Sequence, residues 1–226
     1  MEKRSDFQGV YWLKVDSEER IATINLVPGV QVYGERLIVD KDIEYRLWDP
    51  FRSKLSAAII NGLKYLPLKE GSKVLYLGAS TGTTASHVSD IIGDKGIIFC
   101  VEMSPRVARE LMERCVKYRR NMIPIIEDAR KHENYHSIFG HVDLVYCDIA
   151  QPDQTDIAIA NCKHFLKKNG HLLLAVKSRS IDVTKKPSKV FEEEEEKLKK
   201  AGFKIEQVIE LEPFDKDHVL IHAMME

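Results

Sequence analysis

Short runs of apolar and β-branched residues alternate with turn-forming residues over the first 50 positions. Runs of this length, each bounded by charged residues or by glycine and proline, are typical of small antiparallel strands. The runs are VYWLKV (10–15), RIATINL (20–26), VQVYG (30–34) and ERLIVD (35–40). The pattern predicts a small β-rich subdomain over residues 1–50.

The pattern changes at WDPFRS (48–53), where Asp-Pro is typical of a turn. KLSAAIINGLKYL (54–66) then places apolar residues three and four apart, which predicts a helix over 54–66. Beyond it, apolar strands alternate with helices. Strands are expected at 72–78, 96–103, 121–128, 141–148, 171–177, 203–211 and 218–225, and helices at 83–93, 105–119, 154–170 and 187–202.

Nearly continuous apolar strands between helices are typical of a parallel sheet covered on both faces. The last two strands are joined only by EPFDKD (212–217), which is too short for a parallel crossover, so one of them must run antiparallel. Residues 51–226 are therefore expected to form one α/β domain around a mostly parallel sheet.

The residues that end these strands carry the candidate chemistry, because ligands of open parallel sheets bind beyond the carboxyl ends of the strands. Gly78, Glu102, Asp128, Asp148 and Lys177 end successive strands. The loop GASTG has GxxxG spacing and lacks the GxGxxG pattern of a dinucleotide pyrophosphate site. Together these residues predict an adenosine-type ligand that faces an acid and a lysine.

Several motifs then make a family resemblance specific. They are YRLWDPFRSKLSAAI (45–59), VLYLGASTGTT (74–84), MIPIIEDAR (122–130), DIAQPDQT (148–155) and FDKDH (214–218). With them the chain resembles fibrillarin, the RNA 2′-O-methyltransferase of box C/D ribonucleoprotein particles, over nearly its whole length. Without a glycine/arginine-rich extension it is similar to the compact archaeal form.

The resemblance implies the S-adenosylmethionine-dependent methyltransferase fold, which is Rossmann-like, with a mostly parallel seven-stranded sheet and an antiparallel last strand. It implies S-adenosylmethionine as the cofactor and 2′-O-methylation of ribose in rRNA and tRNA as the reaction. The cofactor contacts carried over are Gly78, Ala79, Thr83, Thr84, Glu102, Met103, Asp128, Ala129, Asp148, Ile149, Ala150 and Gln151.

The resemblance also implies four catalytic residues, Lys54, Asp148, Lys177 and His218. We expect Lys177 to contact the 2′-oxygen and to take or polarise its proton in a partly dry cleft, with Asp148 orienting that lysine and facing the methyl donor. Lys54 and His218 would orient the ribose and the neighbouring phosphate. From the residues alone, Lys54 is an exposed residue of a first helical turn and His218 a half-buried strand residue.

Charge limits how RNA can be bound. Thirty-four basic and 35 acidic side chains give a net charge of −1, so no field of the whole molecule attracts a polyanion. A local basic rim is expected instead, although ordinary surface charge is an alternative for its last two members. The rim consists of Arg46, Arg52, Lys54, Arg179, Lys185 and Lys186.

The resemblance implies four partners: a guide RNA, a target RNA, a Nop-domain scaffold protein and a kink-turn-binding ribosomal-type protein. Neither a membrane nor a metal is expected, since no apolar run approaches bilayer length and the four cysteines lack metal-site spacing. The cysteines are predicted to be reduced core thiols. The N-terminus lacks an apolar h-region, so a cytoplasmic protein is expected.

Three other functions remain open at this stage. A nicotinamide-dependent dehydrogenase would also use an acid after a glycine loop, although the GxxxG spacing disfavours it. A non-catalytic assembly subunit would keep the fold without turnover, and the filled catalytic positions disfavour this function. A small-molecule or another RNA methyltransferase is the nearest rival enzyme, and the basic rim is the feature against a small-molecule substrate.

Overall fold

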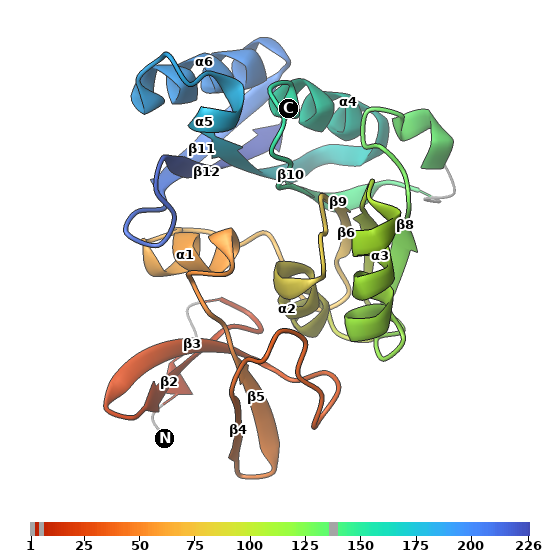
Figure 1. Ribbon diagram of the computed structural model, residues 1–226, viewed down its shortest axis with the longest axis vertical. Helices are drawn as coiled ribbons and strands as arrows, with labels where there is room; N and C mark the ends of the chain where they lie inside the picture. Colours follow the sequence, from red (N-terminus) through yellow and green to blue (C-terminus); the bar gives the residue numbers. More distant parts are fainter. Residues whose placement is uncertain (1–2, 5–6, 136–139) are drawn as a thin grey trace.

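Two β-sheets organise the chain in the computed structural model, which describes residues 3–4, 7–135 and 140–226 (Figure 1). The first is a five-stranded antiparallel sheet with the order β1-β2-β3-β5-β4. Its strands are β1 (Lys3–Arg4), β2 (Tyr11–Val15), β3 (Glu18–Ile24), β4 (Leu37–Asp40) and β5 (Ile43–Leu47). Residues 48–53 connect this sheet to helix α1 (Lys54–Ile60), which precedes the second sheet.

One predicted strand of this sheet is wrong. VQVYG (30–34) is irregular, because the Glu35 carboxylate accepts hydrogen bonds from the backbone N–H groups of Val32 and Tyr33 that a neighbouring strand would otherwise take. In contrast, β5 was not predicted. Its exposed and buried residues do not alternate simply, and its arginine points into the protein.

The second sheet has seven strands in the order β11-β12-β10-β9-β6-β7-β8. They are β6 (Lys73–Leu77), β7 (Ile97–Val101), β8 (Met122–Ile125), β9 (Val142–Cys147), β10 (Leu166–Lys177), β11 (Phe203–Glu210) and β12 (His218–Met225). Only β12 runs antiparallel to its neighbours, β10 and β11, and the other pairs are parallel. The predicted α/β fold with an antiparallel last strand is confirmed.

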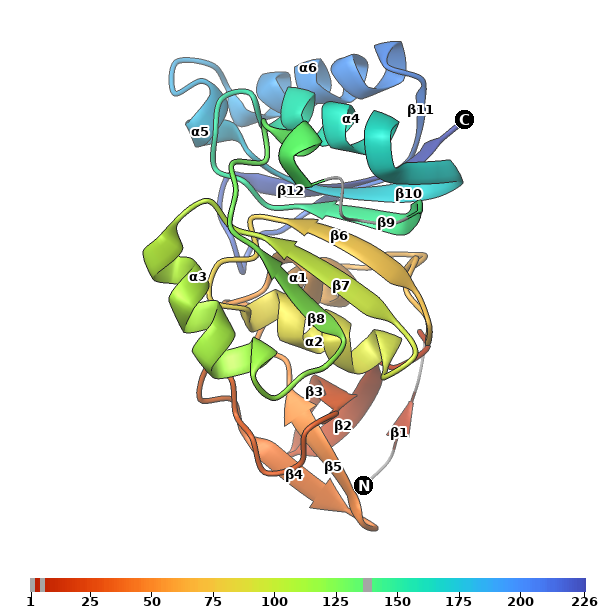
Figure 2. The ribbon, with the colours of Figure 1, turned by 90° about the vertical axis from the view of Figure 1, so that its right-hand side faces the viewer.

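Helices cover both faces of this sheet, with α4, α5 and α6 on one side and α1, α2 and α3 on the other (Figure 2). Alternate residues of β6 enter the two resulting cores, Val74 and Tyr76 on the α2 side and Leu75 and Leu77 on the α4 side. The helices are α1 (Lys54–Ile60), α2 (Thr83–Ile92), α3 (Pro105–Leu111), α4 (Gln154–Phe165), α5 (Ser178–Ile181) and α6 (Pro187–Lys200), with a π-helical turn at Met112–Val116 and a 3₁₀ turn at His132–Tyr135.

Two helices end earlier than the apolar pattern predicts. The helix expected over 54–66 stops at Ile60, because the Asn61 side chain donates to the backbone carbonyls of Glu210 and Glu212 and Gly62 takes a φ of +95°. The helix expected over 154–170 stops at Phe165, because Leu166 already pairs with β9. Long-range contacts thus override the local pattern at both ends.

The first sheet lies against α2, and a buried ionic cluster joins the two. Arg46 on β5 is 0% exposed and forms ion pairs with Glu35 (2.7 Å) and with Asp90 of α2 (2.8 Å). The prediction that Arg46 belongs to an RNA-binding rim is therefore wrong. Nearby, burial lowers the pKa of His87 well below its usual value, and the charges of Arg46 and Arg119 add to the effect.

All four cysteines are buried and free, as predicted. None of the described helices combines the length and the apolar character needed to cross a membrane.

Candidate active site

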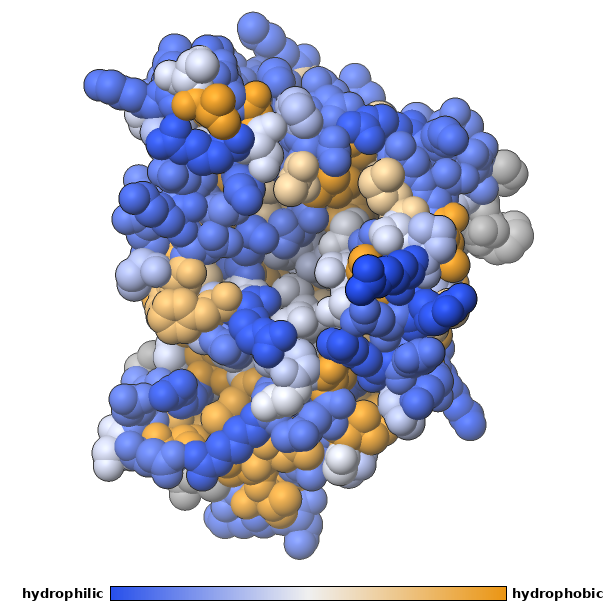
Figure 3. Space-filling view, viewed as in Figure 1, coloured by the Kyte–Doolittle hydropathy of each residue, from blue (hydrophilic) through white to orange (hydrophobic). Residues whose placement is uncertain are grey.

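The carboxyl ends of β6, β7, β8 and β9 meet at one edge of the second sheet and enclose a cavity of about 230 Å³. Figure 3 shows the molecule hollowed near its middle, between the part that carries α4–α6 and the part that carries α1–α3. The lining residues are Gly78, Ser80, Val101, Glu102, Met103, Glu127, Asp128, Ala129, Arg130, Asp148, Ile149, Ala150, Gln151 and Ile157. The structure thus gathers every predicted cofactor contact except Ala79, Thr83 and Thr84.

Gly78 lets the ends of β6 and β9 approach closely. Its φ is +81°, and a Cβ at this position would lie 2.4 Å from the backbone oxygen of Asp148. The Asp148 N–H in turn donates to the carbonyl of Leu77 at 3.0 Å. Only glycine meets both conditions, so this position shapes the cavity through its missing side chain.

Glu102 is held in place at the end of β7. One carboxylate oxygen accepts the N–H of Ser80 (3.0 Å) and the other accepts the N–H of Ser104 (2.9 Å). Each oxygen keeps a further lone pair, so the carboxylate can also accept both hydroxyls of a ribose. The half-exposed Met103 beside it offers apolar surface to a purine, and these donor and acceptor properties fit the adenosine half of S-adenosylmethionine.

Arg130 closes one wall of the cavity and was not predicted as a site residue. Its guanidinium donates to Asp153 at 2.8 and 2.7 Å and to Gln151 at 3.2 Å, which joins the loop after β8 to the loop after β9. These hydrogen bonds lower the pKa of the Asp153 carboxyl. The only sequence signal was a cation in MIPIIEDAR, because the two partners that join the loops, Gln151 and Asp153, lie more than twenty residues away.

A hydrogen bond joins the start of α2 to the start of α1. The Thr84 hydroxyl donates to the hydroxyl of Ser53 at 2.9 Å, and Ser53 caps the N-terminus of α1. Ala79, Thr83 and Thr84 lie outside the cavity lining, and their contacts with the cofactor stay predictions. Among the described residues, no three His, Cys, Asp or Glu side chains gather as a metal site.

Asp148 belongs both to the cavity and to an ion pair with the first residue of α1. The Lys54 ammonium donates to the Asp148 carboxylate at 3.0 Å, and both side chains are only about a quarter exposed, 23% and 25%. Lys54 is therefore a partner of the site rather than a free surface residue. Behind this pair, burial raises the pKa of the Tyr76 hydroxyl well above its usual value, and the charge of Asp148 adds to the shift.

Lys177 and His218 lie directly opposite each other on β10 and β12. Lys177 is exposed, and its side chain forms no hydrogen bond or ion pair within the described part of the chain. The expected contact of Lys177 with Asp148 is not formed, because Lys54 pairs with Asp148 instead. The expected partly dry cleft around Lys177 is not seen either, because the residue is exposed. His218 is 8% exposed and also lies near Asp215, which was not predicted as a site residue although it belongs to FDKDH.

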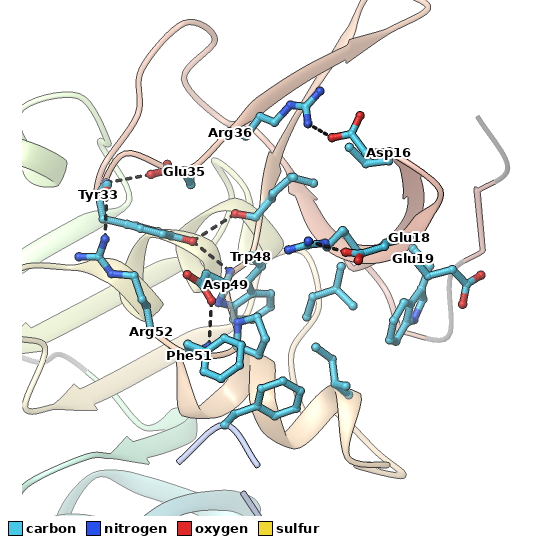
Figure 4. Close-up of a pocket in the computed structure, with 18 of the residues that line it drawn as sticks. Asp16, Glu18, Glu19, Tyr33, Glu35, Arg36, Trp48, Asp49, Phe51 and Arg52 are labelled. Carbon is cyan, nitrogen blue, oxygen red and sulfur yellow. Dashed lines mark hydrogen bonds and ion pairs between the residues drawn. The ribbon is translucent and has the colours of Figure 1, made fainter. Parts of the chain in front are cut away.

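The remaining cations of the predicted rim are mostly paired. Arg52 lies over the Tyr33 ring at 5.1 Å and donates to its carbonyl at 3.0 Å (Figure 4). Arg179 pairs with Asp217, and Lys185 pairs with a glutamate of α6. Lys186 is exposed without such a partner among residues 7–135 and 140–226. An RNA-binding role for these side chains stays a prediction.

A larger cavity, of about 590 Å³, lies between the first sheet and the turn that leads into α1 (Figure 4). Trp48, Phe51 and Phe214 line it together with Asp16 and Glu18, which pair with Arg36 and Arg20 of the same lining. It shares no residue with the cavity at the strand ends and holds none of the predicted cofactor contacts. The cofactor contacts predicted from the sequence therefore select the smaller cavity.

Comparisons with known proteins identify the family of the chain. A sequence model described as fibrillarin matches residues 1–226. The "Fibrillarin-like rRNA/tRNA 2′-O-methyltransferase" of Methanopyrus kandleri is 52% identical over 99% of this chain and 96% of its own. The crystal structure of Aeropyrum pernix fibrillarin with natively bound S-adenosyl-L-methionine superposes with a TM-score of 0.90, at 48% identity over 98% of this chain and 99% of that one. The structure of a fibrillarin/Nop5p complex gives 0.86, at 40% identity over 97% and 98%. The chain belongs to the fibrillarin family.

Proposed function

We propose that this protein transfers a methyl group from S-adenosylmethionine to the 2′-hydroxyl of ribose in rRNA and tRNA. The observation that carries the proposal is the double role of Asp148, which lines the cavity and also pairs with Lys54. A donor in the cavity and a ribose beside Lys54 would therefore meet at this carboxylate. The relative from Methanopyrus kandleri is named for this reaction, and the relative from Aeropyrum pernix carries this cofactor.

When bound, S-adenosylmethionine supplies a methyl group on a positively charged sulfur. Glu102 would accept hydrogen bonds from the ribose of the cofactor, Asp128 would accept from the adenine amino group, and the residues that follow Asp148 would cover the methionine end. The protein's main task is alignment, which can contribute roughly 7–11 kcal/mol to lowering a barrier. Alignment needs a rigid site, and the fixed carboxylate of Glu102 and the close approach of two strand ends at Gly78 make the cavity rigid.

The protein must also manage one proton. As the 2′-oxygen forms its bond to the methyl carbon, the carbon–sulfur bond breaks with its electron pair remaining on sulfur, and the hydroxyl proton leaves to a base. Lys54, Lys177 and His218 would surround the ribose. Lys177 would contact the 2′-oxygen from the end of β10, where this residue is exposed.

A guide RNA and partner proteins would deliver the target RNA. With a net charge of −1 and few unpaired rim cations, the chain alone should bind RNA weakly and with strong salt dependence. We therefore assign it to a box C/D particle with guide RNA, target RNA and a kink-turn-binding protein. A relative assembled with Nop5p supports the Nop-domain scaffold. The buried free thiols support a reducing compartment, so we infer a cytoplasmic protein.

The test is methyl transfer from labelled S-adenosylmethionine to a target RNA, with and without the guide RNA and the partner proteins. Label should enter the RNA only in the assembled particle. Lys177→Ala should abolish transfer and keep cofactor affinity, whereas Lys200→Ala on the exposed face of α6 should change neither. Transfer to a small hydroxyl compound with none to RNA would contradict the proposal.

A further inference from the structure

Asp215 reaches two of the predicted catalytic side chains at once. It lies in the loop between β11 and β12, which hangs beside α1 in Figure 1. Its Oδ1 is 2.9 Å from Nδ1 of His218, and its Oδ2 is 3.8 Å from Nζ of Lys54. Because Lys54 also pairs with Asp148, acids and bases alternate from the end of β9 through α1 to the start of β12.

One hydrogen bond of His218 defines which ring nitrogen is free. Nδ1 lies 2.7 Å from the backbone carbonyl of Lys216, and a carbonyl can only accept, so Nδ1 must carry a proton. In the neutral ring Nε2 then bears the lone pair. His218 is 8% exposed. Its Nε2 has no hydrogen-bond partner among the described residues and is not sealed from solvent.

We propose that Asp215 is a positioning residue that fixes the His218 ring, and that Nε2 of His218 accepts the proton of the ribose 2′-hydroxyl. The inference rests on the methyl transfer proposed above. In the step, the O–H bond breaks as an N–H bond forms on Nε2, while the oxygen gains the methyl carbon and sulfur keeps the electron pair of the broken bond. The Lys216 carbonyl, which accepts Nδ1–H, and the Asp215 carboxylate 2.9 Å from the same nitrogen then stabilise the imidazolium by a hydrogen bond and by charge.

The charges around His218 are compatible with this role. Lys177 lies opposite His218 on β10. Lys54 of α1 lies near Asp215, the acid beside the ring, and the charge of Lys54 is also balanced by its ion pair with Asp148. Asp215 is thus the one carboxylate within ion-pair distance of the ring among the described residues. Histidine is also the side chain most often used as a general base near neutral pH.

The experiment measures single-turnover methyl transfer against pH in the assembled particle, at saturating labelled S-adenosylmethionine and RNA. The variants are Asp215→Asn, Asp215→Glu and His218→Gln. The matched control is Asp217→Asn, which changes an acid of the same loop that pairs with Arg179 instead. Cofactor affinity is measured in parallel by calorimetry, and folding by circular dichroism.

Asp215→Asn should slow transfer by about 100-fold, the scale of general base catalysis, while cofactor affinity stays within about twofold. It should also displace the pH–rate profile, Asp215→Glu should recover part of the rate, and His218→Gln should remove the pH-dependent limb. An Asp215→Asn profile that matches that of Asp217→Asn would overturn the positioning role. A pH–rate profile of His218→Gln that keeps the limb of the wild type would overturn the assignment of His218 as the proton acceptor. An inactive wild-type particle would instead refute the proposed function itself.

Discussion

Replacing Gly78 with alanine should separate the shape of the cofactor cavity from the stability of the fold. The added Cβ would lie 2.4 Å from the backbone oxygen of Asp148, where real contacts begin near 3.0 Å. The carbonyl must therefore retreat by about 0.6 Å, and Asp148 moves with it; displacements of about 1 Å at a reacting centre can reduce rates about 100-fold. We expect methyl transfer to fall by about that factor and S-adenosylmethionine to bind at least about tenfold more weakly.

Gly71→Ala is the matched control. Gly71 has a φ of +84°, close to the +81° of Gly78, but a Cβ there would meet nothing within 4 Å. Both variants share the strain of a left-handed alanine, about 1–2 kcal/mol, which lowers the Tm of a chain of this size by about 2–8 °C. Only Gly78→Ala should lose cofactor affinity by calorimetry. Equal affinity in the two variants would refute the reasoning about the cavity.

Three further outcomes can be measured. Arg46→Ala removes the ion-pair partner of the buried Glu35 carboxylate and one of the two arginines that pair with Asp90, and should lower the free energy of unfolding in urea by about 3–5 kcal/mol; wild-type stability would contradict its structural role. Burial, together with the charge of His171, lowers the pKa of His222 to about 4. As the pH drops, the unfolded chain therefore binds a proton at this residue before the folded chain does. The free energy of unfolding should fall between about pH 6.5 and pH 4, by about 1–3 kcal/mol after solvent screening. His222→Gln should flatten that dependence, and an unchanged slope would count against it. Lys186→Ala should reduce the salt slope of RNA binding by about one, whereas the ion-paired Lys185 should contribute less; equal slopes would remove the distinction.

The sequence predicted the second sheet well, because strands buried on both faces need continuous apolar runs. It also predicted the acids at the strand ends, since parallel strands bring their carboxyl ends to one edge. It failed where the decisive partner is distant in the chain. Arg46 looks like a surface cation until Asp90 neutralises it, and α1 ends early because Asn61 meets the end of β11.

The predicted catalytic residues show the same division. Lys54, Asp148 and His218 follow from the family motifs, but their pairing does not. Spacing in the sequence could not show that Lys54 rather than Lys177 holds Asp148, because this depends on where α1 lies relative to β9. Nor could it single out Asp215 among the three acidic residues of its loop, since only the fold turns that carboxylate toward His218.

The central claim is that the protein methylates the 2′-oxygen of a ribose. The most direct measurement compares two target RNAs in the assembled particle with labelled S-adenosylmethionine, one intact and one with a 2′-deoxyribose at the nucleotide selected by the guide. Label should enter the intact RNA, and none should enter the deoxy RNA. Equal labelling of both RNAs would place the methyl group on another atom and contradict methylation of the 2′-oxygen.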